Sequence, residues 1–275
     1  MKKARVTITL TPNILSEVDK LVDGTDITNR SNAVETILRD HFKPAERPMA
    51  FVLAGGKGTR LRPLTYELPK AMIPIKGKPI LEHIINKLKE AEVTEIVLSI
   101  GYLGNKIRDH FGDGEKFGVN IRYIEESKAL GTGGAVKAAQ NLFKSDSFVI
   151  NGDNLFDFDL SKMYEFHKKR KALATIAVTT RKDISQFGVV EMDGDKVVNF
   201  IEKPKTEQRS NLVNAGIYLL NPLAISLIPD GESNISSELL TKLAQRGKLY
   251  GFIYSGQWFP CDNMSLYEDA LKNWG

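Results

Sequence analysis

A glycine-rich stretch with basic side chains, residues 53–65, offers the clearest chemistry in the sequence. Its glycines and nearby cations are Gly55, Gly56, Gly58, Arg60 and Lys70. Glycines that follow a strand let backbone N–H groups approach phosphate oxygens without an obstructing Cβ atom. Guanidinium and ammonium groups suit the dense negative charge of a triphosphate. The stretch therefore predicts a loop that binds a phosphate-rich ligand.

Two common phosphate loops are excluded by the spacing of this stretch. A Walker A loop needs Gly-Lys followed by Ser or Thr, and Lys57 is followed by Gly58. A dinucleotide-binding fingerprint counted from Gly56 needs Gly or Ala at its sixth position, where Leu61 stands.

The string over residues 55–65, with Pro69 and Lys70 after it, resembles the signature of the sugar-phosphate nucleotidyltransferase family. The resemblance continues in order through residue 258. Residues 130–135 look like the family's second glycine turn, and Asn151-Gly152-Asp153 looks like its metal-binding strand end. The sugar-side motifs are matched by residues 187–191, 202–204 and 213–216.

The resemblance implies an enzyme that transfers a nucleoside monophosphate from a nucleoside triphosphate to a sugar 1-phosphate and releases pyrophosphate. It assigns Arg60, Lys70 and Asp153 to catalysis, with Asp153 binding Mg²⁺. The residues implied to bind the nucleotide are Leu53, Ala54, Gly55, Gly56, Gly58, Thr59, Gly131 and Gly133. Those implied to bind the sugar phosphate are Gly188, Glu202, Lys203 and Asn214.

This reaction needs no nucleophilic triad. A sugar phosphate is anionic at neutral pH and attacks without a general base, so catalysis is expected to consist of positioning and electrostatic stabilisation.

The sequence departs from the family pattern near its C-terminus. Many relatives place a second metal-binding aspartate two residues after a tryptophan, but here Pro260 holds that position after Trp258. Proline has no side-chain ligand atom. We hypothesise that Asp262, two residues further on, takes this role.

The nucleobase and sugar are less well determined. The form of the second glycine turn resembles guanylyl-transferring relatives and leaves room for a purine, which favours GTP and mannose 1-phosphate. A thymidylyl- or uridylyltransferase acting on glucose 1-phosphate is the alternative.

The elements that must position these residues alternate along the chain, which predicts an α/β fold with a Rossmann-like, mainly parallel sheet over residues 49–275. We expect helices over residues 80–91, 102–111, 133–143, 235–245 and 264–273. We expect strands over residues 49–54, 95–100, 119–124, 148–150, 173–179, 187–191, 196–201, 212–219 and 248–254.

A small domain, residues 1–43, precedes a proline-containing linker at 44–48. Its alternating segment 5–10, followed by two short helical patterns, resembles a ribbon–helix–helix domain. That resemblance implies a homodimer formed through the N-terminal strand, with Arg5, Thr7 and Thr9 facing DNA bases. About 40 residues cannot bury enough surface alone, so the domain must pair either with its own copy or with the large domain.

Three functions remain open for the whole chain. The first is an enzyme with an attached dimerisation module. The second is a DNA-binding regulator whose large domain senses a nucleotide sugar. The third is a protein with both functions. Seven basic against six acidic residues in positions 1–43 is a small excess for DNA binding.

Composition and the N-terminal residues indicate the cellular compartment of the protein. The chain has 275 residues, a net charge of +4 and one cysteine, Cys261, so no disulfide forms within it. Residues 1–13 lack the apolar core of a secretory signal, and no apolar run is long enough to span a membrane. We expect a cytoplasmic protein.

Overall fold

The computed structural model describes residues 6–25, 27–41, 48–126, 128–206 and 208–275. The chain divides into two compact units, Met1–Arg47 and Pro48–Gly275.

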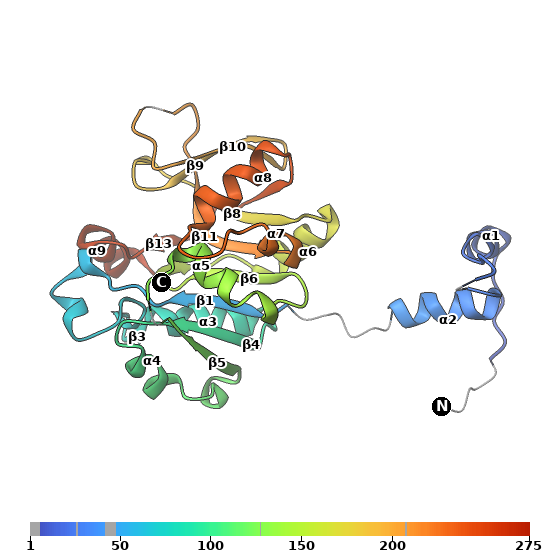
Figure 1. Cartoon of the computed structure of the whole chain (residues 1–275), viewed down its shortest axis with the longest axis horizontal. Coiled ribbons are helices and arrows are strands. Elements are labelled where there is room, and N and C mark those ends of the chain that lie inside the picture. The colour runs from blue at the N-terminus through green and yellow to red at the C-terminus, as the bar shows by residue number, and fades with distance from the viewer. Residues whose placement is uncertain (1–5, 26, 42–47, 127, 207) are drawn as a thin grey trace. The chain divides into compact units, whose positions relative to one another are not determined.

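A nine-stranded sheet forms the centre of the large unit, in the order β5-β4-β1-β6-β11-β8-β12-β10-β9 (Figure 1). Its first four strands are parallel: β1 (Ala50–Ala54), β4 (Glu95–Ile100), β5 (Asn120–Glu125) and β6 (Ser147–Asn151). Their apolar runs are buried on both faces, as is typical of parallel sheets covered by helices.

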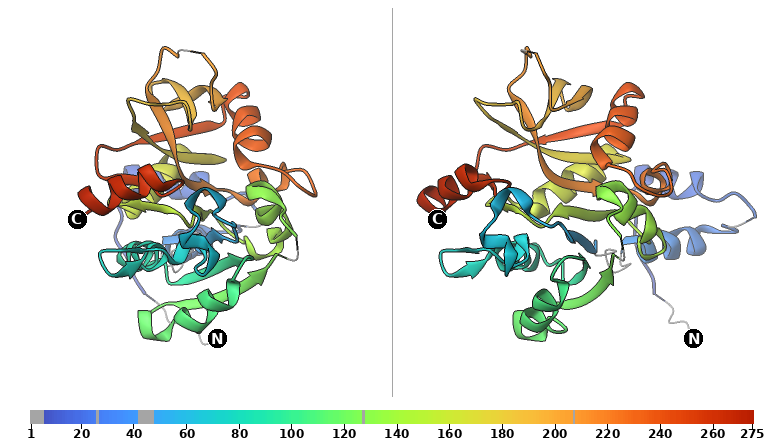
Figure 2. Two further views of the ribbon diagram at one scale, coloured as in Figure 1. Left: turned by 90° about the vertical axis from the view of Figure 1, so that its left-hand side faces the viewer. Right: turned by 60° about the vertical axis from the view of Figure 1, so that its left-hand side comes forward.

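The other half of the sheet is mixed, so the prediction of a mainly parallel sheet is wrong there. Its strands are β8 (Ala174–Thr180), β9 (Gly188–Asp193), β10 (Lys196–Glu202), β11 (Leu212–Leu220) and β12 (Leu249–Ile253). Only β8 and β12 pair in parallel; β11 runs antiparallel to β6 and β8. A short turn at Gly194 joins β9 to β10, and so short a connection permits only antiparallel pairing. In Figure 2 these strands stand at the far side of the unit from β5.

Helices cover both faces of the sheet: α3 (Ile80–Glu90), α4 (Gly104–Phe111), α5 (Gly131–Ala138), α6 (Leu160–Arg170), α7 (Pro222–Ser226), α8 (Thr241–Gln245) and α9 (Met264–Asn273). Alternate residues of β1 face the two cores: Val52 packs in the cluster of α3, and Phe51 in that of α5. None of the helices in the described segments is long and apolar enough to cross a membrane.

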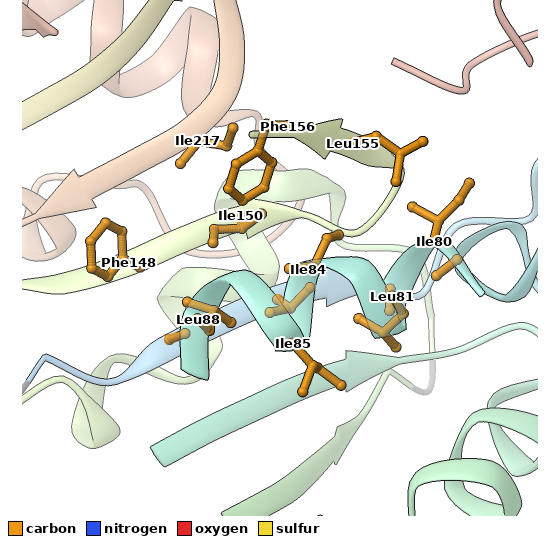
Figure 3. Packing of buried hydrophobic residues seen from close by; sticks show 14 of the residues in the cluster. Ile80, Leu81, Ile84, Ile85, Leu88, Phe148, Ile150, Leu155, Phe156 and Ile217 are labelled. Atoms are coloured by element: carbon orange, nitrogen blue, oxygen red, sulfur yellow. The ribbon is translucent and has the colours of Figure 1, made fainter. Parts of the chain in front are cut away.

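The apolar side of α3 shows how the sequence pattern builds the core. Five of its residues are buried: Ile80, Leu81, Ile84, Ile85 and Leu88. They share a cluster with Phe148 and Ile150 of β6, as Figure 3 shows. Burial of such side chains contributes about 1.5–3 kcal/mol each relative to exposure.

Most expected elements are confirmed, with shifts at their ends. The predicted helix 235–245 begins instead with a π-helical turn, Ile235–Leu240, which α8 continues. Two helices, α6 and α7, were not predicted from the sequence, and neither were four short strands: β2 (Pro74–Ile75), β3 (Lys78–Pro79), β7 (Asn154–Phe156) and β13 (Trp258–Pro260).

The small unit contains α1 (Pro12–Lys20) and α2 (Arg30–His41). The side chain of Asn29 accepts a hydrogen bond of 3.0 Å from the backbone N–H of Asn32, as a residue that caps the start of a helix does. A strand was expected over residues 5–10, and its described part, residues 6–10, pairs with no strand among the residues that the structure describes. Arg5 lies outside the described residues.

A buried polar group lies at the amino end of β6, away from its carboxyl edge. Asp146, 7% exposed, accepts hydrogen bonds from Asn221 Nδ2 at 2.7 Å and from Lys168 Nζ at 3.0 Å. His167, in α6, lies with Nε2 3.5 Å from Asp146 Oδ1. Burial opposes ionisation, but the contacts with His167, Lys168 and Asn221 outweigh it and hold the pKa of Asp146 well below its usual range.

We predict that Asp146→Asn lowers the free energy of unfolding at pH 7 by about 2 kcal/mol, because it leaves buried donors without an ionised acceptor. The folded-state pKa is depressed, so this stabilisation is present above the unfolded-state pKa of about 4 and is lost as the pH falls through the folded value. Urea unfolding at several pH values would measure it. Exposed Asp193→Asn serves as control, and an equal effect of both variants at pH 7 would contradict the prediction.

Candidate active site

A cavity of about 1030 Å³ opens at the carboxyl ends of the parallel strands. From that half of the sheet it is lined by residues at the carboxyl ends of β1, β4, β5 and β6 or directly after them: Leu53, Gly55, Gly56, Gly101, Glu126, Asn151 and Asp153. From the mixed half it is lined by Gly188, Glu202, Lys203 and Asn214. The cavity therefore joins the predicted nucleotide-binding residues to the predicted sugar-binding ones.

A second, smaller cavity of about 170 Å³ adjoins it and shares Asp153 and Asp262 with it. Its other lining residues include Ala54, Gly58, Thr59, Arg60 and Lys70.

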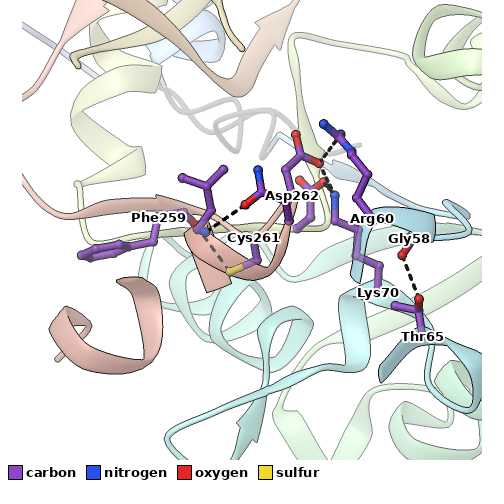
Figure 4. Close-up of polar contacts among 10 residues, drawn as sticks. Gly58, Arg60, Thr65, Lys70, Phe259, Cys261 and Asp262 are labelled. Atoms are coloured by element: carbon purple, nitrogen blue, oxygen red, sulfur yellow. Dashed lines mark hydrogen bonds and ion pairs between the residues drawn. The ribbon is translucent and has the colours of Figure 1, made fainter. Parts of the chain in front are cut away.

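The glycine-rich loop is held in a tight turn. Gly58 has a φ of +59°, and an added Cβ atom would lie 2.8 Å from Thr65 Cγ2. The buried Thr65 donates a hydrogen bond of 2.8 Å from Oγ1 to the carbonyl oxygen of Gly58 (Figure 4). These contacts require glycine at position 58.

Lys70 lies at the centre of the charged groups (Figure 4). Its ammonium group donates to Asp153 Oδ2 and to Asp262 Oδ1, and Arg60 Nη2 lies 3.1 Å from Asp262 Oδ1. The Lys70 side chain is 13% exposed, whereas that of Arg60 is 52% exposed. Two carboxylates and two cations, all singled out in the sequence, thus meet at one point.

The pairing of β13 with β7 brings Asp262 to this point. Pro260 lies opposite Asn154, and the next backbone N–H, that of Cys261, donates to the carbonyl oxygen of Asp153 at 2.9 Å. Asp262 follows directly, so its carboxylate lies beside that of Asp153.

The electrostatics of the cluster favour the ionised pairs. Burial alone would lower the pKa of Lys70, but Asp153 and Asp262 outweigh it and the pKa is raised. Burial would raise the pKa of Asp262, but Lys70, Arg60 and Lys203 outweigh it and the pKa is lowered. Burial also raises the pKa of the Cys261 thiol to about 12, so this group is protonated at neutral pH and is a poor nucleophile.

The sugar-side residues come from β9, β10 and β11. Gly188 pairs with Glu202, and its added Cβ atom would lie 2.5 Å from the ring of Phe200. Lys203 has a φ of +44° and donates its backbone N–H to Phe187. Asn214, 9% exposed, donates from Nδ2 to Tyr218 and accepts the backbone N–H of Gly216 at Oδ1.

Comparison with protein families matches residues 49–272 to the model described as "Nucleotidyl transferase". The chain belongs to this family. Among curated proteins, it is 41% identical over 235 residues to "Bifunctional protein GlmU" of Methanococcus maripaludis, and 39% identical over 234 residues to "Mannose-1-phosphate guanyltransferase" of Yarrowia lipolytica. The alignments cover 81% and 80% of this chain but only 54% and 64% of those proteins.

Among solved structures, the nucleotidyl transferase unit is similar to a putative glucose-1-phosphate thymidylyltransferase of Bacillus anthracis, crystallised with a sucrose. The TM-score is 0.76 at 29% identity, with 82% of this chain and 94% of that chain covered. The expected α/β nucleotidyltransferase fold is thereby confirmed.

The second glycine turn of this nucleotidyl transferase lies only partly on the cavity. Gly131 and Thr132 line it, whereas Gly133 packs against Ser233 and Asn234 and donates its N–H to Ser233 O at 2.9 Å. Gly133 therefore helps to position the start of α5. Its backbone N–H is bonded to Ser233 and is not available to a nucleotide.

Glu126 and Asn151 both line the cavity, but Glu126 was not predicted from the sequence, and Asn151 was named only as part of the motif that ends in Asp153. A signal was present, since Glu126 directly follows β5 and Asn151 ends β6. Polar side chains at the carboxyl ends of parallel strands are where ligands bind in such sheets.

We predict that Gly131→Ala destabilises the large unit by roughly 2 kcal/mol more than Gly247→Ala, as measured by urea unfolding. Both glycines have positive φ values, +71° and +63°, so both variants carry the same backbone cost. An added Cβ atom lies 2.4 Å from Ser233 O at position 131 but meets nothing within 4 Å at position 247. An equal loss of unfolding free energy in both variants would contradict the prediction. It would show that local movement relieves the contact between the added Cβ atom and Ser233 O at little cost.

Proposed function

We propose that the protein is a sugar-1-phosphate nucleotidyltransferase, which makes a nucleoside diphosphate sugar and pyrophosphate. The observation that carries the proposal is the cluster of Lys70, Arg60, Asp153 and Asp262 at the junction of the two cavities. It lies between the glycine-rich loop and the sugar-side residues, where the two substrates' phosphates would meet.

In the proposed reaction, an oxygen of the sugar phosphate attacks the α-phosphorus of the nucleoside triphosphate. A new P–O bond forms, and the bond from the α-phosphorus to the bridging oxygen breaks, so that pyrophosphate leaves with the electron pair. Lys70 and Arg60 stabilise the negative charge of the triphosphate and of the departing pyrophosphate. Lys203 holds the sugar phosphate, and Glu202 accepts hydrogen bonds from sugar hydroxyl groups. Such electrostatic stabilisation is commonly the largest contribution to catalysis.

Asp153 and Asp262 fit a magnesium ion. Their carboxylates already converge on one positive charge, the Lys70 ammonium group. Among the described residues, no group of three or more His, Cys, Asp or Glu side chains is placed to hold a metal. This agrees with Mg²⁺, which in proteins is bound by one or two carboxylates together with substrate phosphates and water. When bound, the ion would neutralise phosphate charge and make the α-phosphorus more electrophilic.

An enzyme is favoured over a regulator that only senses a nucleotide sugar. A sensor needs to bind its ligand, but it does not need two carboxylates paired with a half-buried lysine between its two substrate-binding regions. For the substrates we propose GTP and mannose 1-phosphate, supported by the likeness to the guanyltransferase of Yarrowia lipolytica. Glucose 1-phosphate with dTTP or UTP is the second candidate, supported by the thymidylyltransferase-like structure.

Purified protein is expected to release pyrophosphate when it is given Mg²⁺, one of four nucleoside triphosphates and one of three sugar 1-phosphates. Asp153→Asn should lower kcat/KM at least about 100-fold, because it removes a carboxylate from the reacting centre. Asp193→Asn, at the exposed β9–β10 turn, is the matched control.

The same assay tests Asp262 as the second metal-binding residue. Asp262→Ala should raise the Mg²⁺ concentration for half-maximal rate about tenfold or more. An unchanged Mg²⁺ dependence would remove Asp262 from the metal site, and an active Asp153→Asn variant would refute the assigned centre as a whole.

We propose further that the small unit dimerises. Its described residues bury few large side chains, while Val6, Ile8, Ile14, Leu21, Ile37 and Leu38 are between 41% and 76% exposed. Val6 and Ile8 alternate with the exposed Thr7 and Thr9, as in a strand that pairs with a second copy.

DNA binding by the small unit has less support than dimerisation. Arg30 is bound to Asp19 through two hydrogen bonds, so the charge that it would offer to DNA phosphates is partly neutralised. Contact of Arg5, Thr7 and Thr9 with DNA stays a prediction from the resemblance.

Light scattering should give twice the mass of one 30.7 kDa chain at micromolar concentration. The double variant Val6→Asp, Ile8→Asp should be monomeric, because four charges would be brought together at an apolar interface. Val198→Asp, at a 50% exposed valine of the large unit, should leave the mass unchanged. A monomeric wild-type protein would exclude the proposed dimer.

A further inference from the structure

We propose that a further cavity, outside the candidate active site, binds a phosphorylated metabolite and thereby strengthens the binding of the sugar 1-phosphate. This effector cavity has a volume of about 680 Å³ and is formed by the end of β8, the loop from β8 to β9, the residue before β11 and the start of α9. It shares Gln186 and Phe187 with the large cavity. The effector cavity itself is independent of the proposed nucleotidyltransferase function, whereas its effect on substrate binding rests on that function.

The charged groups of the effector cavity favour an anionic ligand. Arg181 and Lys182 both line it, and Lys182 is exposed and forms no ion pair with any residue that the structure describes. Asp183 is the only carboxylate among the described lining residues. It already accepts hydrogen bonds from Ser185, at 3.0 Å from the backbone N–H and at 2.7 Å from the hydroxyl group. Two cations are therefore available to one anionic group, and a phosphate monoester is the anion that they fit.

The remaining surface of the effector cavity fits a ring with polar substituents. The Phe187 ring and the Leu266 side chain provide apolar area, and the amides of Gln186 and Asn211 provide donors and acceptors. The volume lies within the range of roughly 300–1,000 Å³ that is usual for small-molecule sites. Together with the cations, this lining indicates a phosphate monoester carried on a ring. A sugar phosphate and a nucleoside monophosphate both have this chemistry.

Three stacked side chains separate the effector cavity from the large cavity. The guanidinium group of Arg181 lies 5.0 Å from the centre of the Trp258 ring and 5.8 Å from that of Phe187. The two rings contact each other edge to face, with their centres 5.3 Å apart. Arg181 lines the effector cavity, Trp258 lines the large cavity, and Phe187 lines both. A ligand on one side of this wall therefore contacts side chains that shape the other side.

The wall is bonded to the residue that is proposed to hold the sugar phosphate. Lys203 donates its backbone N–H to the carbonyl oxygen of Phe187 at 3.1 Å, and its φ of +44° makes its backbone dependent on such support. Gly188, on the sugar side of the large cavity, directly follows Phe187. The position of Phe187 thus affects both sugar-side residues.

Arg181 allows a ligand to fix this wall without breaking it. Its Nη2 donates to the carbonyl oxygen of Trp258 at 3.3 Å, whereas its Nη1 lies 3.9 Å from Asp269 Oδ2, beyond hydrogen-bond distance. A ligand phosphate can bind Nη1 while Nη2 stays on Trp258. The ordering of Arg181 and Phe187 then precedes the arrival of the sugar phosphate, whose binding costs less entropy as a result. We therefore expect positive coupling between the two ligands.

Mannose 6-phosphate and GMP are the probes for this effector cavity. Each carries a phosphate monoester on a ring, and neither can complete the proposed reaction, since the first has no phosphate on its anomeric carbon and the second has no pyrophosphate to release. At least one of them should lower the KM of the wild-type protein for the sugar 1-phosphate about fivefold or more, with kcat changed less than about twofold. Comparison of the two probes distinguishes a sugar phosphate from a nucleotide as the ligand.

The double variant Lys182→Glu, Asn211→Asp should abolish the effect of the probe, because it places negative charge where the phosphate would bind. Its kcat and KM without probe should match those of the wild type, since neither residue lines the large cavity. The double variant Asn105→Asp, Lys106→Glu is the matched control. It makes the same change of charge at two exposed positions of α4 that line neither cavity, and it should keep the effect.

The inference is overturned if neither probe lowers KM, or if a probe lowers it equally in the wild type and in the Lys182→Glu, Asn211→Asp variant. A probe that only competes in the active site raises KM and also counts against it. Each of these results leaves the nucleotidyltransferase assignment intact, because pyrophosphate is still released. If no pair of substrates releases pyrophosphate, that assignment fails instead. Calorimetry with the same probes then decides the effector cavity: the Lys182→Glu, Asn211→Asp variant should lose a binding event that the wild type and the α4 control retain, and equal binding by all three overturns the inference.

Discussion

The interaction on which the site depends is the sharing of one lysine ammonium group by two aspartates. Lys70 follows the loop after β1, Asp153 follows β6, and Asp262 follows β13. Two carboxylates this close repel each other strongly unless a cation lies between them. The fold thus brings three distant segments together around two carboxylates that need a cation between them, and the proposed magnesium site follows from that need.

Strand β6 is the structural basis for combining two substrates. It runs parallel to β1 on one side and antiparallel to β11 on the other. The parallel half supplies the glycine-rich loop and Glu126, and the mixed half supplies Gly188, Glu202 and Lys203. Because β6 ends at Asn151, just before Asp153, the proposed metal-binding carboxylate lies where the two halves meet.

The parts of the fold that could be predicted from sequence are those fixed by local pattern. The strand at 95–100 is a continuous buried apolar run, and the stripe of α3 has helical spacing, so both were found. β7 and β13 were missed because three residues carry no readable period and pair only with each other. The direction of each strand in the mixed half depends on which strands pair across the sheet. The local sequence of a single strand does not determine this pairing.

Residues of the candidate site were also predictable where a local sequence motif marks them. Arg60, Lys70 and Asp153 stand in recognisable motifs, whereas Asp262 was proposed only as the nearest aspartate after Trp258. The structure brings all four together. Gly133 was assigned to the nucleotide although its N–H is bonded to Ser233, a contact between segments far apart in sequence. Glu126 was overlooked because a single glutamate after a strand is common, and only the neighbouring Ser99 and Gly55 give it a defined orientation.

The pairing of β13 with β7 also explains how the chain accommodates proline at position 260. β13 ends at Pro260, and the next backbone N–H, that of Cys261, still donates to the carbonyl oxygen of Asp153 at 2.9 Å. The aspartate of this chain stands two positions beyond the slot that the family resemblance assigns to it. The hydrogen bond of Cys261 fixes the chain just before Asp262, so a carboxylate that stands outside the strand still reaches the Lys70 ammonium group.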